Sequence, residues 1–263
     1  MISYKLNDNV FREYDIRGIV EDDFHVDFVY DLGLAIGTRF LNCEESSIAI
    51  SGDLRQTTNL IKLKLIEALL DTGINVVDLG TLPTPVNYYS MYVLENINCT
   101  VQITGSHNSM DYNGFKISHN KAPFYGGDIQ KLKEIILNRD FITNNAYPNK
   151  GDLEFVNILP EYISLLKSKV QINRNIYIAM DCLNSCGALS APELFSHYDN
   201  IHLRTINCTP NGDCLTDSPD PTLDENLKEL VNEVKNNKCD FGIAYDGDAD
   251  RLVVVDNRGK IIR

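Results

Sequence analysis

Two short segments hold the residue types that phosphate chemistry needs, and the first of them runs from Thr104 to Lys116. It offers the Ser106 hydroxyl, the His107 imidazole, the Asn108 amide and the Lys116 ammonium within thirteen residues. Such a set can supply a phosphoryl acceptor and donors for phosphate oxygens. The segment follows an apolar run that predicts a strand, so we expect it where α/β proteins place ligands. A polar turn with a capping serine is the alternative interpretation.

The second segment is Asp246-Gly247-Asp248-Ala249-Asp250-Arg251, which follows another predicted strand. Its three carboxylates repel one another unless a cation neutralises them, and hard oxygen ligands suit Mg²⁺ or Ca²⁺. A calcium-binding EF-hand loop would need Gly at its sixth position and Glu at its twelfth, where this chain has Arg251 and Asn257. Haloacid-type phosphatases also have paired aspartates after a strand, but their motif continues into Gly-Thr, whereas this loop continues into Asp-Arg. A solvated acidic turn is the remaining alternative.

The two segments complement each other chemically. Three aspartate oxygens leave positions open on an octahedral Mg²⁺, which commonly takes water and phosphate oxygens there. A phosphorylated Ser106 would be such a ligand.

The elements that must position these segments alternate between β-branched runs and amphipathic stripes. We expect strands at 47–51, 75–79, 99–104, 176–181, 201–207, 241–246 and 252–256, and helices at 59–72, 128–138, 158–170, 188–197 and 223–236. A polar stretch over 141–152 has no periodicity and predicts a linker. The pattern therefore predicts an α/β protein with domains at 1–150 and 151–263.

Composition narrows the functional classes. The 263 residues are 43% hydrophobic and 23% charged, as in ordinary globular proteins, and they carry a net charge of −13. Such a charge, with no basic cluster, argues against nucleic acid as a partner. We expect no membrane association, because no apolar run approaches the ~20 residues that span a bilayer. The first fifteen residues lack the apolar core of a secretory signal, so we expect a cytoplasmic protein.

Seven cysteines are present, and none forms a CxxC pair. Cys182 and Cys186 lie four positions apart and could be half of a metal site. With no second pair nearby, we interpret all seven as thiols that fill the core in a reducing compartment.

The two segments together give the sequence its resemblance to a known family. The combination TGSHNSMDYNGFK and DGDADR resembles the α-D-phosphohexomutases, most closely the phosphomannomutase/phosphoglucomutase group. The opening FREYDIRG, the segment DLGTLPTP and the segment SPDP fit the same pattern. The resemblance covers essentially the whole chain. It implies two consecutive three-layer α/β domains with mixed sheets, the phosphoserine loop in the first and the metal loop in the second.

The resemblance also implies roles for individual residues. Ser106 would be the phosphoserine and a metal ligand, and Asp246, Asp248 and Asp250 would complete the protein's share of a site for one Mg²⁺. Lys116 and His107 would be catalytic, with Lys116 the candidate general acid/base. The residues that would line the cleft and bind substrate or phosphate are Tyr14, Arg17, Asn108 and Arg251.

The reaction that the family carries out is implied as well. A phosphoserine enzyme would interconvert hexose 1-phosphate and hexose 6-phosphate through a bound hexose 1,6-bisphosphate. The family has four domains, so we expect this chain to be the N-terminal half of such an enzyme, without its domains III and IV. We expect it to be a monomer or a weak dimer. By itself it would be inactive as a mutase. The alternatives are a non-catalytic phosphoprotein or metal-binding module, and a metal-dependent sugar phosphatase.

Several positions depart from the family pattern. Ser109 stands where Pro is usual, and the usual GRDGR reads SGDLR, which keeps only Asp53 and Arg55. Asp217 and Ser218 replace a frequent His-His. Asp181–Ser185 replaces a turn richer in glycine, and fewer glycines make positive backbone angles harder to adopt. These changes affect fine geometry, and none touches an expected phosphoryl or metal ligand.

Overall fold

The computed structural model describes residues 4–143, 150–212 and 218–263. The chain divides into two compact units. The first consists of Met1–Gly80, Asn87–Gly105 and Asp111–Asn157, and the second of Thr81–Val86, Ser106–Met110 and Ile158–Arg263. Two short segments from the first half of the sequence, one of which begins at Ser106, thus belong to the second unit. The division at residues 150 and 151 stays a prediction of the sequence.

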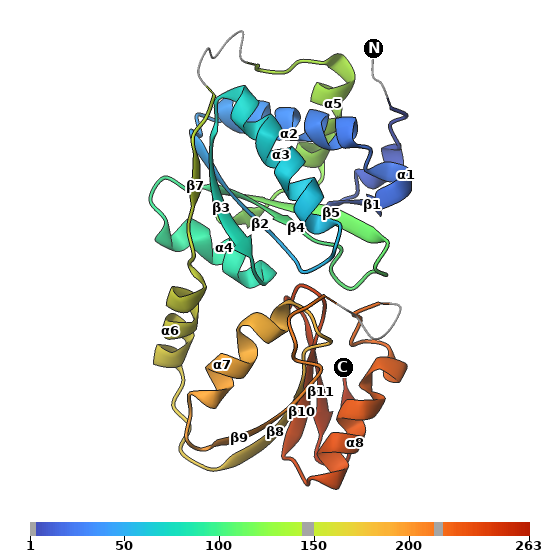
Figure 1. Cartoon of the computed structure of the whole chain (residues 1–263), viewed down its shortest axis with the longest axis vertical. Coiled ribbons are helices and arrows are strands. Elements are labelled where there is room, and N and C mark those ends of the chain that lie inside the picture. Colours follow the sequence, from blue (N-terminus) through green and yellow to red (C-terminus); the bar gives the residue numbers. More distant parts are fainter. Residues whose placement is uncertain (1–3, 144–149, 213–217) are drawn as a thin grey trace. The chain divides into compact units, whose positions relative to one another are not determined.

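The first unit is built on one mixed sheet in the order β1-β5-β4-β2-β3-β7, with β6 paired to β5 (Figure 1). Its strands are β1 (Ile16–Ile19), β2 (Ser47–Gly52), β3 (Asn75–Thr81), β4 (Cys99–Ile103), β5 (Tyr112–His119), β6 (Ala122–Pro123) and β7 (Leu153–Phe155). Strands β2 and β4 are parallel, and β5 runs antiparallel to both β4 and β1. The parallel pair therefore ends at one edge of the sheet, where Asp53 and Thr104 follow.

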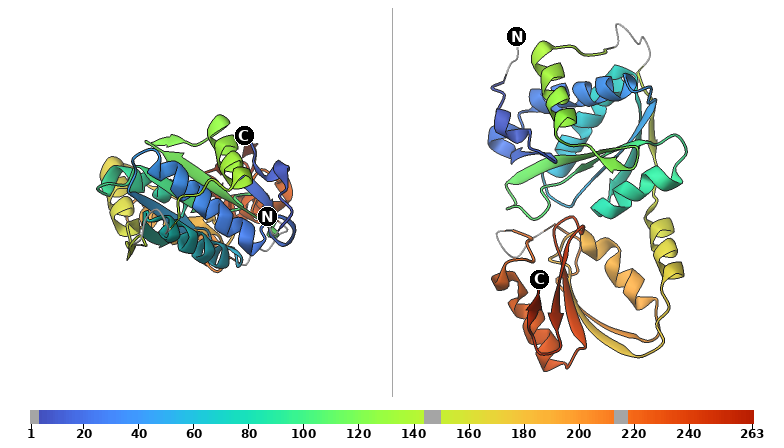
Figure 2. Two further views of the ribbon diagram at one scale, coloured as in Figure 1. Left: turned by 90° about the horizontal axis from the view of Figure 1, so that it is seen from above. Right: turned by 180° about the vertical axis from the view of Figure 1, so that it is seen from behind.

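Helices cover both faces of this sheet. The unit contains the 3-10 helix η1 (Asp8–Val10) and the α-helices α1 (Val20–Asp23), α2 (Val26–Leu41), α3 (Thr58–Thr72), most of α4 (Thr84–Val93), and α5 (Gly127–Asn138). Figures 1 and 2 show α2, α3 and α5 on one face of the sheet and α4 on the other. Residues such as Phe28, Leu65 and Ile50 pack in one core beneath α2 and α3. Helix α3 ends at Gly73, whose φ of 94° is the left-handed geometry that glycine adopts most readily.

The second unit has a smaller sheet in the order β12-β11-β10-β8-β9. Its strands are β8 (Ile176–Asp181), β9 (Ile201–Ile206), β10 (Phe241–Tyr245), β11 (Leu252–Asp256) and β12 (Ile261–Ile262). Its helical segments are α6 (Leu159–Lys169), η2 (Cys186–Leu189), α7 (Ala191–Ser196), η3 (Asp224–Leu227) and α8 (Lys228–Asn236). Strands β9, β8 and β10 are parallel, so the turns after β8 and β10 leave the sheet at the same edge.

Alternate residues of strand β8 pack on opposite faces of this sheet. Ile178 and Met180 contact a cluster that includes Ala191 of α7, whereas Ala179 contacts a cluster that includes Leu230 and Val234 of α8. The alternation is the two-residue period of a strand buried on both sides. Figure 1 shows α7 and α8 on the two sides of the sheet. Each unit therefore has three layers, which confirms the predicted fold class.

The expected elements are present, with changes at their ends. The helix expected at 188–197 is a 3-10 turn followed by α7, and the one expected at 223–236 is η3 followed by α8. The sequence patterns did not predict η1, α1, α2 and α4, or the strands β1, β5, β6, β7 and β12. The expected linker lies partly outside the described residues, as do Asp217 and Cys214. Within the described part of the chain, no helix is both long and apolar enough to cross a membrane.

Candidate active site

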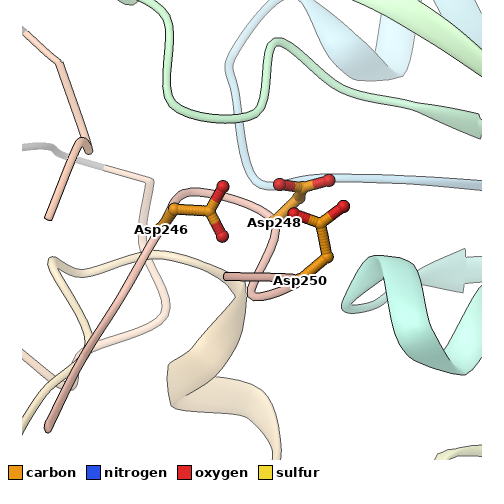
Figure 3. Close-up of side chains that lie close together, drawn as sticks. All are labelled: Asp246, Asp248 and Asp250. Atoms are coloured by element: carbon orange, nitrogen blue, oxygen red, sulfur yellow. The ribbon is translucent and has the colours of Figure 1, made fainter. Parts of the chain in front are cut away.

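The aspartate loop joins β10 to β11 in the second unit. One oxygen from each of Asp246, Asp248 and Asp250 lies within 4.8 Å of the others. Figure 3 shows the three side chains close together on this loop. Asp246 and Asp248 are fully buried, whereas Asp250 is partly exposed. Among the described residues this is the one group of three or more acidic, histidine or cysteine side chains that could hold a metal ion.

Charge is concentrated in this loop. Burial, together with the neighbouring charges of Asp248 and Asp250, raises the pKa of Asp246 to about 7, although Arg251 acts to lower it. The guanidinium of Arg251 lies 3.0 Å from the Asp246 carboxylate and 3.3 Å from that of Asp250. One guanidinium can balance only one of three carboxylates, so the loop favours an added cation.

Ser106 belongs to the same unit, and its hydroxyl meets the aspartate loop. Its Oγ donates a hydrogen bond of 3.0 Å to Oδ2 of Asp246 and accepts one from the guanidinium of Arg251. The side chain is fully buried, and its φ of +52° is uncommon for a residue with a Cβ. Residues held in such angles gather at functional sites, where the surrounding contacts fix them.

Glycine is required at position 247 by this close approach. A Cβ on Gly247 would lie 2.4 Å from the carbonyl oxygen of Ser106 and 2.8 Å from Cγ of Pro219. The Ser106 backbone therefore packs directly on the aspartate loop. A second segment of the unit meets the loop at Thr84, whose amide donates to the carbonyl oxygen of Asp248 at 2.9 Å.

A buried carboxylate in the first unit fixes the chain immediately before Ser106. Asp53 follows β2, and its Oδ2 accepts hydrogen bonds from Thr104 Oγ1 at 2.7 Å and from the Gly105 amide at 3.2 Å. The Arg55 side chain pairs with Asp53 and also donates to the carbonyl oxygen of Tyr112. The two residues kept from the GRDGR pattern thus hold the end of β4 in place.

The other predicted site residues divide between the units. His107 and Asn108 belong to the second unit with Ser106, and both are half-buried. Tyr14, Arg17 and Lys116 belong to the first unit. Arg17 is buried and donates to the carbonyl oxygen of Gly105, Tyr14 is exposed with its ring near Tyr125, and Lys116 lies on β5. Their membership of one site with the aspartate loop stays a prediction.

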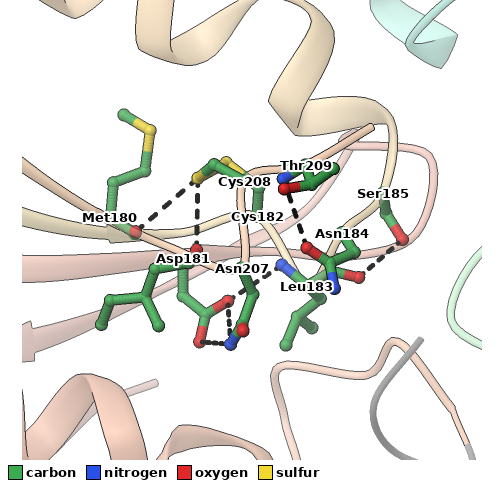
Figure 4. The surroundings of a disulfide bond; sticks show 10 residues. Met180, Asp181, Cys182, Leu183, Asn184, Ser185, Asn207, Cys208 and Thr209 are labelled. Carbon is green, nitrogen blue, oxygen red and sulfur yellow. Dashed lines mark hydrogen bonds between the residues drawn. A yellow bond between two sulfur atoms is a disulfide. The ribbon is translucent and has the colours of Figure 1, made fainter. Parts of the chain in front are cut away.

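The turn after β8 corrects the interpretation of the cysteines. Cys182 and Cys208 form a disulfide that joins the carboxyl ends of β8 and β9, so not all cysteines are thiols (Figure 4). The free thiols among the described residues are those of Cys43, Cys99, Cys186 and Cys239. Sequence spacing could not reveal the pair, because its members follow two separate strands, β8 and β9, whose parallel register brings them together.

The same turn adopts positive backbone angles without glycine. Leu183 and Asn184 have φ values of 47° and 52°. Hydrogen bonds hold Asn184 in this conformation. Its main-chain amide donates to the carbonyl oxygen of Asn207, and its side-chain Oδ1 accepts from the main-chain amide of Thr209. Asp181, at the end of β8, is fully buried, and burial raises its pKa to about 6.

The donor set of the aspartate loop fits Mg²⁺ in its chemistry. Three carboxylates are hard oxygen ligands, two of them are buried, and their neighbour Ser106 could add phosphate oxygens. No cysteine or histidine belongs to the cluster within the described ranges, so the set does not favour a softer metal.

Comparison with known proteins agrees with this fold and site. Residues 8–143 match the family described as phosphoglucomutase/phosphomannomutase, alpha/beta/alpha domain I, and residues 160–259 match its domain II. These matches define the class as the α-D-phosphohexomutases. The chain belongs to the phosphoglucomutase/phosphomannomutase family.

The chain is also similar to individual relatives and to a solved structure. It is 37% identical over 257 residues to the phosphomannomutase/phosphoglucomutase of Pseudomonas syringae pv. tomato, covering 98% of this chain and 54% of the relative. It is 34% identical over 254 residues to the phosphoglucomutase of Neisseria gonorrhoeae, covering 97% and 54%. The crystal structure of a phosphoglucomutase/phosphomannomutase family protein from Burkholderia thailandensis matches with a TM-score of 0.91 and 29% identity, covering 98% of this chain and 57% of the other. The chain spans about half the length of the curated relatives it matches.

Proposed function

We propose that this chain supplies the phosphoserine and metal-binding part of a Mg²⁺-dependent phosphosugar mutase. The observation that carries the proposal is the contact between the Ser106 hydroxyl and the aspartate loop, at Asp246 and Arg251. A nucleophilic hydroxyl and a cluster of hard metal ligands meet at one point. Relatives named phosphomannomutase/phosphoglucomutase support the substrate class, a hexose phosphate.

The reaction would proceed by two phosphoryl transfers. Phosphoserine 106 gives its phosphoryl group to the free hydroxyl of a hexose 1- or 6-phosphate, which forms a bound 1,6-bisphosphate. After the sugar turns, its other phosphate returns to the serine oxygen. Lys116, with His107 nearby in the sequence, would carry the proton that leaves or returns to the sugar hydroxyl.

The chain's own residues would stabilise the transferred group. Arg251 contacts the serine oxygen, so its guanidinium can offset negative charge on the phosphoryl oxygens. Asp246, Asp248 and Asp250 would hold one Mg²⁺, which when bound supplies charge stabilisation of that group. Tyr14, Arg17 and Asn108 would contact the substrate or its phosphate.

Mass spectrometry tests the central step. The protein is incubated with Mg²⁺ and glucose 1,6-bisphosphate, and the phosphate is located by peptide mapping. We expect it on Ser106 in the wild type and in Ser109→Ala, the matched control, and nowhere in Ser106→Ala. Phosphate on Ser109, or full labelling of the Ser106→Ala variant, would refute the assignment.

Turnover separates the mutase from its alternatives. In a coupled assay from glucose 1-phosphate to glucose 6-phosphate, we expect these 263 residues alone to lack sustained turnover. The chain covers about half the length of its relatives. A bisphosphate that must reorient while it stays bound needs contacts at both of its phosphates. Steady release of inorganic phosphate would instead favour the sugar phosphatase, and stable phosphorylation without transfer to glucose 1-phosphate would favour a non-catalytic phosphoprotein.

A further inference from the structure

Thr84 contacts Asp248 at two atoms. It is the first residue of α4 and is fully buried, as is Asp248. The hydroxyl of Thr84 donates a hydrogen bond of 2.5 Å to Oδ2 of Asp248, and its amide donates one of 2.9 Å to the Asp248 carbonyl oxygen. Both residues belong to the second unit. One residue thus fixes the same aspartate twice, its main-chain amide at the backbone and its hydroxyl at the carboxylate.

The three carboxylates of the loop are held by different kinds of donor. The charged guanidinium of Arg251 contacts Asp246 and Asp250. At Asp248 one carboxylate oxygen accepts from a neutral hydroxyl, that of Thr84. A hydroxyl orients a carboxylate without itself neutralising it. An ionised carboxylate has acceptor sites to spare, which lets one oxygen accept from Thr84 while the group still binds a metal.

We propose that Thr84 is a positioning residue of the metal site, which orients the Asp248 carboxylate for Mg²⁺. The inference rests on the proposed function, because it assumes that the aspartate loop binds the metal. Partners that hydrogen-bond to metal ligands typically contribute about 10- to 100-fold to metal affinity. The short segment that brings Thr84 to the loop gains a reason for its place in the second unit.

Titration calorimetry with MgCl₂ on four proteins tests this role. Thr84→Val keeps the shape of the side chain and removes the hydroxyl, and we expect roughly tenfold weaker Mg²⁺ binding. Thr84→Ser keeps the hydroxyl and should bind Mg²⁺ close to wild type. The matched control is Thr100→Val on β4, since the buried Oγ1 of Thr100 has no hydrogen-bond partner among the described residues. We expect unchanged affinity in that variant.

The outcomes separate the inference from the proposed function. Wild-type binding with equal affinity in Thr84→Val overturns the positioning role alone, as does a fall in thermal midpoint without a fall in affinity. If the wild type binds no Mg²⁺, or if Asp250→Asn binds Mg²⁺ as tightly as the wild type, both the proposed metal site and this inference are overturned. If Thr84→Val does not fold, Thr84→Ala removes the same hydroxyl with a smaller side chain and gives the same reading.

Discussion

Buried aspartates end a strand in each unit, and the two units treat them differently. Asp53 follows β2 in the first unit, and Asp246 follows β10 in the second. The oxygens of Asp53 accept from the Arg55 amide and side chain, the hydroxyls of Thr58 and Thr104, and the Gly105 amide. The aspartate loop instead gathers three carboxylates within 4.8 Å and pairs two of them with one arginine.

The difference separates a structural carboxylate from a functional one. At Asp53 the protein itself supplies a cation and several donors, so the charge is compensated and fixes the chain before Ser106. At the loop like charges lie together, and compensation by Arg251 is partial. Residues that repel one another in the folded state are retained where a ligand relieves the repulsion. The same substitution should therefore have opposite effects on stability at the two sites.

The largest effect is expected at Asp53. In Asp53→Asn the new amide group would face the donors of Thr104 and Gly105, and Arg55 would stay buried without a charged partner. We expect the free energy of unfolding of the first unit to fall by about 3–5 kcal/mol. Hydrogen exchange of peptides from β2 and β4, measured at increasing urea concentrations, gives that loss. Exchange equal to wild type would show that Asp53 is not the anchor.

Much of this contrast could be predicted from the sequence, and its limits have physical causes. The aspartate loop stood out because its carboxylates occupy alternate positions, and Ser106 because it lies within thirteen residues of other groups that can bind phosphate. The role of Asp53 did not, because Thr104 and Gly105 lie 51 and 52 residues away in the sequence and reach Asp53 only through the parallel β2–β4 pair. Thr84 was missed for the same reason: it contacts Asp248 across a sequence separation of 164. Helix α2 was missed because it is buried along much of its length, so its apolar residues do not follow the single stripe of a surface helix.

The turn after β8 offers a third strand end, held by a covalent bond. Cys182 and Cys208 close a loop with a sequence separation of 26. Breaking the bond with reductant should lower the free energy of unfolding of the second unit by about 2–4 kcal/mol, since the unfolded chain regains freedom. Urea unfolding with and without dithiothreitol measures the change. Cys208→Ser is the control, because it should already be weakened and should not respond to reductant.

Asp181, the last residue of β8, is intermediate between Asp53 and Asp246 in how far its charge is compensated. Burial raises its pKa to about 6, although the Leu183 amide and Asn207 donate to it. From about pH 4 to 6 the unfolded state loses this proton while the folded state keeps it, so stability falls as pH rises. Asp181→Asn removes that dependence and should be about 2 kcal/mol more stable than wild type at pH 7, but not at pH 4. Urea unfolding at both pH values measures it, and an equal gain at pH 4 would exclude ionisation as the cause.

The smallest effect, opposite in sign to that at Asp53, is expected at Asp248. Without Mg²⁺, Asp248→Asn removes one of three like charges, while the amide oxygen can still accept from Thr84. The second unit should therefore gain about 1 kcal/mol in free energy of unfolding. With Mg²⁺ the order reverses, because a ligand that binds only the folded state stabilises the wild type and the variant lacks a carboxylate to bind it. Thermal unfolding of both proteins with EDTA and with MgCl₂ gives all four values. A destabilised variant in EDTA would mean that Asp248, like Asp53, serves the fold, and the contrast between the two units would fail.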